Sequence, residues 1–168
     1  MTLIFEPLDW PAEQAEVVAF LTSNIWPFHA SSLLTAEDAA GVRVHESDVA
    51  TYWIRESDET VGLIRLLDID DLDDGSGSPL FDLRIAEQHR GRGLGCDAVR
   101  WLTHLLFTSY TRLHRIEATT RDDNFAMQTV FSRCGYRLEG RMAEAWLNAD
   151  RTRNDALTYA ILRREHND

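Results

Sequence analysis

The stretch QHRGRGLG, residues 88–95, lies between a β-like run at residues 80–86 and a helix-like run that begins at Leu94. A strand that passes through a glycine turn into a helix presents free backbone N–H groups and the positive end of the helix dipole, an arrangement that binds phosphate. The alternating glycines allow the backbone to approach an anion closely. Arg90 and Arg92 add positive charge. The stretch therefore predicts an anion-binding turn.

Two familiar phosphate-binding motifs do not fit this turn. The dinucleotide fingerprint requires GxGxxG in a first strand–helix turn, whereas GRGLG has a different spacing and lies after the midpoint of the chain. The nucleoside-triphosphate loop requires GxxxxGK followed by Ser or Thr, and this stretch contains no lysine. A tight turn that simply needs glycine is the structural alternative.

The composition is that of one globular domain, residues 1–168, with a net charge of -11. This acidic balance disfavours nucleic acid and anionic membranes as partners and mildly favours a cationic partner. The sequence has no basic, apolar leader and no run of about 20 apolar residues, which predicts a cytoplasmic protein. Cys96 and Cys134 form neither a disulfide framework nor a metal-binding cluster, so no metal is expected.

Hydrophobic periodicity predicts a mixed α/β (α+β) domain with about seven strands and about four helices. Their order is β-α-α-β-β-β-α-β-α-β-β, with no internal repeat and no domain linker. The expected strands cover residues 2–8, 51–55, 61–69, 80–86, 115–120, 136–148 and 152–163, and the expected helices cover residues 11–25, a short segment after Thr35, residues 94–110 and residues 122–133.

Two well-separated motifs resemble the GNAT superfamily, the acyl-CoA-dependent N-acetyltransferases. Residues 88–93, Q-x-x-G-x-G, are similar to the Q/R-x-x-G-x-G/A loop of that superfamily. Asn124 is followed, at residues 135–136, by a Gly-Tyr pair at the spacing of the superfamily's later helix. The resemblance implies the GNAT fold, with a central, mixed, mostly antiparallel sheet flanked by helices.

A third stretch indicates a branch of the superfamily. Residues 140–146, with Asp155 and Tyr159 beyond them, resemble the closing strands of the RimJ/RimL-like, ribosomal-protein branch. The resemblance as a whole covers residues 80–163; before residue 80 it rests on the order of the elements.

The resemblance implies acetyl-CoA as the cosubstrate. In the family the glycine turn holds the pyrophosphate, and the fourth and fifth strands splay near Ile85, which frees backbone groups of Leu83 and Ile85 to bind pantetheine like an added strand. Asn124 is expected to contact the pantetheine arm, and it could also be a plain helix N-cap. The implied contacts are Leu83, Ile85, Arg90, Gly91, Arg92, Gly93, Leu94, Gly95 and Asn124.

Proton transfer has few candidates in this sequence. Many members of the family use a tyrosine seven residues after the Asn as the acid for the leaving thiolate, and here that position is Phe131. Asp82 is the first candidate for the base, because its strand face is suited to reaching the amine through water. The alternative is that Asp82 merely pairs with Arg84 or another surface cation. Glu144, on a closing strand, is the second carboxylate.

The segment NIWPFH, residues 24–29, corresponds to a loop that borders the acceptor pocket in this superfamily. Trp26, Phe28 and His29 are expected to form a stacking wall for a ring, with Trp146 as a further candidate. The alternative is that these aromatic residues fill the core beneath the helices.

The sequence thus predicts an N-acetyltransferase that transfers an acetyl group from acetyl-CoA directly to a primary amine. The acceptor is a small cationic or ring-bearing amine, or a protein or peptide N-terminus. The alternative from another class is a non-catalytic acyl-CoA-binding or sensing module, because the tyrosine is missing. A monomer or homodimer is expected, with no nucleic acid and no membrane among its partners.

Overall fold

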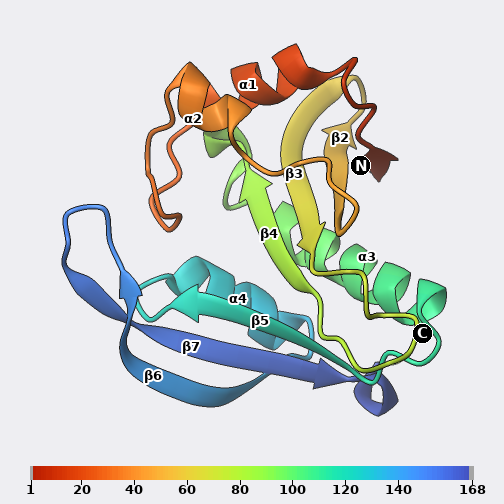
Figure 1. Ribbon diagram of the computed structural model, residues 1–168. Helices are drawn as coiled ribbons and strands as arrows, with labels where there is room; N and C mark the ends of the chain where they lie inside the picture. Colours follow the sequence, from red (N-terminus) through yellow and green to blue (C-terminus); the bar gives the residue numbers. More distant parts are fainter. Residues whose placement is uncertain (1, 167–168) are drawn as a thin grey trace.

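The computed structural model describes residues 2–166, which form seven strands and four α-helices in the predicted order (Figure 1). The strands are β1 (Leu3–Pro7), β2 (Val49–Glu56), β3 (Glu59–Leu67), β4 (Leu80–Ile85), β5 (Arg115–Arg121), β6 (Arg137–Leu147) and β7 (Arg153–Leu162). The α-helices are α1 (Gln14–Thr22), α2 (Ala36–Ala40), α3 (Leu94–Ser109) and α4 (Phe125–Arg133), and the short 3-10 helices are η1 (Glu87–His89) and η2 (Arg163–Glu165).

The strands form two antiparallel sheets. The first has the order β1-β2-β3-β4 and the second has the order β5-β7-β6. The sheets separate between β4 and β5, which are not hydrogen-bonded neighbours, and Figure 1 shows these two strands diverging. The predicted mixed fold of mostly antiparallel strands is confirmed, with its sheet split in two at this point.

Helices cover both faces of the first sheet. Side chains alternate along a strand, so neighbouring residues face opposite ways. On β2, Trp53 packs with α1 and α2, whereas Ile54 packs with α3. On β3, Leu63 likewise faces α1 and α2, and Ile64 faces α3. This double coverage explains why β3 is a nearly continuous apolar run rather than an alternating one.

The first helix is shorter than its sequence pattern predicts. The prediction was residues 11–25, but α1 covers only Gln14–Thr22. The residues before it form a turn in which the Glu13 carboxylate accepts a hydrogen bond from the Asp9 N–H at 2.7 Å. No helix of residues 2–166 is both long and apolar enough to cross a membrane.

The long closing strand β6 is not regular. Its pairing with β7 shifts register between Leu138 and Gly140 and again between Met142 and Trp146. Within the second shift Glu144 has a φ of 52°, in the left-handed region. A bulge of this kind changes the direction of the side chains that follow it. The sequence predicts one uninterrupted strand here, because the pattern of alternation does not reveal a bulge.

Candidate active site

The glycine turn leads from β4, through η1, into α3. Gly93 is the N-cap of α3 with a φ of 91°, and Gly91 has a φ of 76°; both values favour glycine. A Cβ atom built on either residue would meet no heavy atom within 4 Å. The space in front of both glycines is therefore open, and a side chain at either position would enter it.

The backbone of the turn also has unused hydrogen-bond donors. Among residues 2–166, the consecutive N–H groups from Gly91 to Gly95 have no acceptor. The next two amides, of Cys96 and Asp97, donate to the Gly93 carbonyl at 2.9 and 3.3 Å. Free N–H groups at the start of a long helix favour an anion. The turn thus fits the pyrophosphate of a coenzyme A molecule, both in its open space and in its donors.

Gly95 serves a different purpose from the other two glycines. A Cβ atom on Gly95 would lie 3.3 Å from Cγ2 of Val130 on α4, closer than most real contacts. Glycine at this position therefore lets α3 and α4 pack closely where the cavity begins, and Gly95 also lines that cavity.

The two arginines of the turn point in different directions. Arg90 lines the cavity; its Nε donates to the Ile85 carbonyl at 2.9 Å, and its guanidinium lies 5.5 Å from the centre of the Trp26 ring. Arg92 instead pairs with Glu56 at 2.7 Å and is not among the described residues that line the cavity. Arg90 is therefore better placed than Arg92 to meet a ligand.

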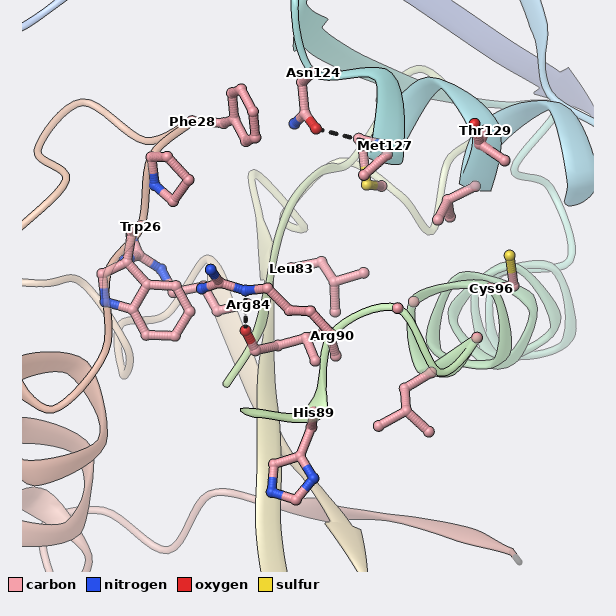
Figure 2. A pocket seen from close by; sticks show the side chains of 18 of the residues that line it. Trp26, Phe28, Leu83, Arg84, His89, Arg90, Cys96, Asn124, Met127 and Thr129 are labelled. Carbon is pink, nitrogen blue, oxygen red and sulfur yellow. Dashed lines mark hydrogen bonds between the residues drawn. The ribbon is translucent and has the colours of Figure 1, made fainter. Parts of the chain in front are cut away.

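A cavity of about 370 Å³ opens beside the glycine turn. The turn, the 26–29 segment, β4 and α4 all contribute to its wall. Figure 2 shows Trp26, Arg84 and Arg90 on one side and Asn124, Met127 and Thr129 on the α4 side. The cavity brings together the expected cofactor contacts Leu83, Ile85, Arg90, Gly91, Gly93, Leu94, Gly95 and Asn124.

The edge of β4 faces this cavity with backbone groups that β3 does not use, and of these the Ile85 carbonyl already accepts from Arg90 Nε. The Ala86 N–H donates to the Val61 carbonyl of β3 at 2.9 Å. Because hydrogen-bonded and non-hydrogen-bonded pairs alternate along an antiparallel ladder, Leu83 and Ile85 direct their N–H and C=O groups away from β3, toward the split. An extended, amide-containing chain could add to this edge as a further strand.

Asn124 is the N-cap of α4 and also lines the cavity. Its Oδ1 accepts a hydrogen bond from the Met127 N–H at 3.2 Å, shown dashed in Figure 2, and its Nδ2 donates to Thr120 Oγ1 at 3.1 Å. The capping role that the sequence suggested is thus present, and it leaves the residue at the cavity wall.

A second cavity, of about 340 Å³, adjoins the first. Both are lined by Phe28, His29, Leu83, Arg84, Asn124 and Met127, so they are neighbouring compartments. Phe131 lines the second cavity and is otherwise buried, with its ring centre 4.9 Å from that of Tyr159. No tyrosine is among the described residues that line either cavity.

Asp82 lies in the second cavity at the centre of a polar cluster. Its Oδ1 is 2.7 Å from Nε2 of His29, and its Oδ2 is 2.7 Å from Nη2 of Arg65 and 3.1 Å from Nε of Arg84. The Asp82 side chain is 14% exposed, which makes these contacts inward-facing rather than surface pairs. Asp82 does pair with Arg84, as the alternative held, but the pair lies inside the cavity.

This cluster changes the proton affinity of Asp82. Burial by itself would raise its pKa, but the hydrogen bond and charge of His29 and the charges of Arg84 and Arg65 outweigh burial and hold the pKa well below its usual range. A carboxylate with so low a pKa is a weak proton acceptor at neutral pH. The geometry therefore favours Asp82 as the residue that positions His29.

The aromatic residues expected to line the acceptor pocket do so only in part. Trp26 is almost fully buried, and its Nε1 donates to the Leu21 carbonyl at 2.8 Å, so it fills the core while one side borders the first cavity. Phe28 is half-buried and lines both cavities, and Trp146 lines the second one. Both interpretations of Trp26 therefore apply at once.

Glu144 is not brought to this site. It lies exposed in the bulge of β6, where its N–H donates to Asp155 Oδ1 at 2.8 Å, and it does not line either cavity. In this position Glu144 does not face the cavities, so the geometry does not support it as a second catalytic carboxylate. Within residues 2–166, no group of three or more His, Cys, Asp and Glu side chains is arranged to hold a metal ion.

Sequence reasoning missed Arg65 as a site residue. Arg65 is the cross-strand partner of Asp82 in the β3–β4 pairing, and its side chain is 12% exposed. An arginine inside the apolar run of β3 was the available signal, because such a residue needs a partner where it is buried.

Several proteins of known structure share this fold. A crystal structure of spermidine N-acetyltransferase from Vibrio cholerae with CoA and spermine aligns with a TM-score of 0.79 at 18% identity, covering 97% of this chain and 96% of that one. A dodecameric structure of spermidine N-acetyltransferase from Vibrio cholerae aligns at 0.74 and 17%, covering 96% and 94%. A probable acetyltransferase aligns at 0.79 and 17%, covering 98% and 94%.

At these identities the structural likeness establishes the fold. No curated protein matches the sequence. Residues 4–137, which run from β1 through the glycine turn and α4 to the start of β6, match the family model described as the acetyltransferase (GNAT) domain. The match covers well over half of the chain, and the chain therefore belongs to the GNAT acetyltransferase family.

Proposed function

We propose that this protein transfers the acetyl group of acetyl-CoA to a primary amine that binds beside Asp82 and His29. The observation that carries the proposal is the continuity of the site. The open glycine turn with its free N–H groups, the free edge of β4 and the Asp82 cluster line two adjoining cavities. An anion, an amide-containing arm and an amine can therefore be held in that order.

The residues on β4 would align the reacting groups. A backbone N–H of Leu83 or Ile85 would donate to the thioester oxygen, where negative charge develops. Holding both reactants in adjoining cavities supplies much of the acceleration, because the reaction becomes effectively unimolecular. The transfer forms a C–N bond and breaks the C–S bond, and one proton leaves the amine while one is gained by the departing sulfur.

His29 is our candidate for the proton acceptor, with Asp82 as its positioning residue. When His29 Nε2 donates to Asp82, Nδ1 is the nitrogen left to accept a proton; it is buried and has no hydrogen-bond partner among residues 2–166, so the amine would reach it by a movement of the ring. A carboxylate behind an imidazole fixes its tautomer and stabilises the imidazolium that forms. This assignment replaces the direct role that the sequence suggested for Asp82.

Two classes of acceptor amine are to be compared. The likeness to a structure that contains spermine makes a polyamine one compound to test, and the RimJ/RimL-like resemblance makes a peptide N-terminus another. The second candidate function is a non-catalytic acyl-CoA-binding module. It is favoured by Phe131, which stands where many family members have a catalytic tyrosine.

Release of free CoA thiol separates the two functions. The purified protein is mixed with acetyl-CoA and a panel of amines, peptides included, and thiol is followed with a chromogenic reagent. We expect thiol release that depends on one class of amine. Tight binding of acetyl-CoA with no amine-dependent release across the panel would favour the binding module.

A further inference from the structure

We propose that the acceptor amine carries an anionic group, such as a carboxylate, which binds Arg84 beside Arg65 in the second cavity. This inference rests on the proposed function, because it names the class of amine that the same site would accept.

Arg84 has a hydrogen-bond donor with no acceptor among residues 2–166. Its side chain is 8% exposed and its Nε lies 3.1 Å from Asp82 Oδ2, but Nη1 is buried and has no hydrogen-bond partner among residues 2–166. Arg84 lines both cavities, and its guanidinium lies 5.1 Å from the centre of the Trp26 ring, which borders the first. Buried donors of charged groups are normally paired. An unpaired one at a cavity wall indicates an acceptor atom supplied by a ligand.

Asp82 cannot neutralise its surroundings. It is the only carboxylate among the described residues that line the two cavities, and it is shared by Arg65, Arg84 and His29. Arg90 and Arg133 line only the first cavity, so they would face the phosphates of the cofactor and do not offset this balance. Burial lowers the pKa of Arg84, and Asp82 offsets this only in part. The site therefore has an excess of positive charge, although the whole chain has a net charge of -11.

This excess has a direct consequence for the acceptor. A polycation would place several ammonium groups among arginines with one shared carboxylate, which is unfavourable where water is scarce. A carboxylate would meet the free side of a guanidinium, whose donors match its geometry. The negative net charge of the chain therefore does not predict the charge of the acceptor, because the interior of the site is positively charged.

The remainder of the second cavity is apolar and aromatic. Phe28, Phe81, Phe131 and Trp146 contribute to its wall. An acceptor that combines an amine and a carboxylate with a hydrophobic body, as aromatic and large aliphatic amino acids do, would match each of these parts. A cavity of about 340 Å³ is of a size for such a small molecule.

Matched acceptor pairs test the inference. L-phenylalanine and L-leucine are compared with their amides, and with spermine, by CoA thiol release at saturating acetyl-CoA. The amide has the less basic amine and is more often neutral, so greater reactivity of the amine cannot explain a preference for the carboxylate. We expect the carboxylates to have a kcat/KM about 10- to 100-fold higher than their amides, the usual effect of one charge-assisted hydrogen-bonded pair.

The Arg84→Gln variant is expected to bring this ratio close to one while the affinity for acetyl-CoA stays unchanged. Arg137→Gln, an exposed arginine of β6 that pairs with Glu139 and Glu165, is the control and should keep the ratio. If Arg84→Gln does not fold, the ratio measured in the parent protein still decides. If Arg84→Gln slows the reaction of carboxylates and amides equally, Arg84 acts on the thioester oxygen. If the variant loses affinity for acetyl-CoA, Arg84 binds the cofactor. Either result overturns the proposal.

The two proposals fail in different ways. Thiol release with the amides or with spermine, equal to or faster than with the carboxylates, overturns the anionic acceptor and leaves the acetyltransferase intact. No thiol release with any amine, although acetyl-CoA binds, overturns both.

Discussion

Replacing Gly93 by valine should weaken acetyl-CoA binding while leaving the protein folded. Gly93 has a φ of 91°, and a Cβ atom there would point into space that no atom occupies within 4 Å. The conformation costs a β-branched residue about 1–3 kcal/mol of stability. The added methyl groups would occupy this open space beside the free amides from Gly91 to Gly95, and we expect them to keep an anion away.

The size of the binding effect follows from the donors that are blocked. Losing one charge-assisted hydrogen bond costs about 1.5–3 kcal/mol, so affinity for acetyl-CoA should fall by about 10- to 100-fold or more. Isothermal titration calorimetry of the folded variant measures this directly, and chemical denaturation measures the stability.

Two other glycines serve as controls. Gly140→Val also places its side chain in open space but without a positive φ, so neither stability nor binding should change much. Gly135→Ala also places a side chain at a positive φ, of 84°, away from the cavities. It should lower stability and leave binding unchanged. If Gly93→Val binds acetyl-CoA as well as Gly140→Val does, the assignment of the turn to the pyrophosphate is wrong.

Three further predictions concern the second cavity. Asp82→Asn and His29→Gln should each lower turnover at neutral pH by about 100- to 10,000-fold, with partial recovery at higher pH as more of the amine is neutral; a pH–rate profile that overlays the parent's would exclude both roles. Phe131→Leu should alter turnover only modestly, through packing, and a loss of several orders of magnitude with the fold and acetyl-CoA affinity retained would show that the ring has a further part. Because the folded-state pKa of Asp82 is depressed, its contribution to the free energy of unfolding is present above about pH 4, the usual pKa of Asp, and is lost as the pH falls below that value. Acid unfolding of Asp82→Asn, followed by circular dichroism, should lack that loss. Equal acid sensitivity of the parent and the variant would contradict the cluster.

The parts of the site that the sequence predicts are those whose physical cause is local. The glycine turn can be read from residues 88–95 because a strand, positive-φ glycines and a helix start follow one another along the chain. Asn124 can be read as a cap because a helix begins at the next residue. The split beside β4 comes from the family resemblance and not from the residues themselves.

The parts that the sequence does not predict depend on contacts between distant segments. Arg65 meets Asp82 only because β3 and β4 pair in one register, and His29 reaches the same carboxylate from another loop. The bulge that leaves Glu144 outside the cavities has no marker in the pattern of alternation. Net charge also misleads, because it sums surface carboxylates that do not line the site.

The most direct test of the account is transfer of an isotope-labelled acetyl group from acetyl-CoA to an amine, followed by mass spectrometry of both products. The account predicts that the labelled acetyl group appears on the amine in step with the release of free CoA thiol, and that Gly93→Val reduces both together. Acetyl-CoA that binds but is consumed no faster with amine than without it, with no label on any amine, would contradict the account.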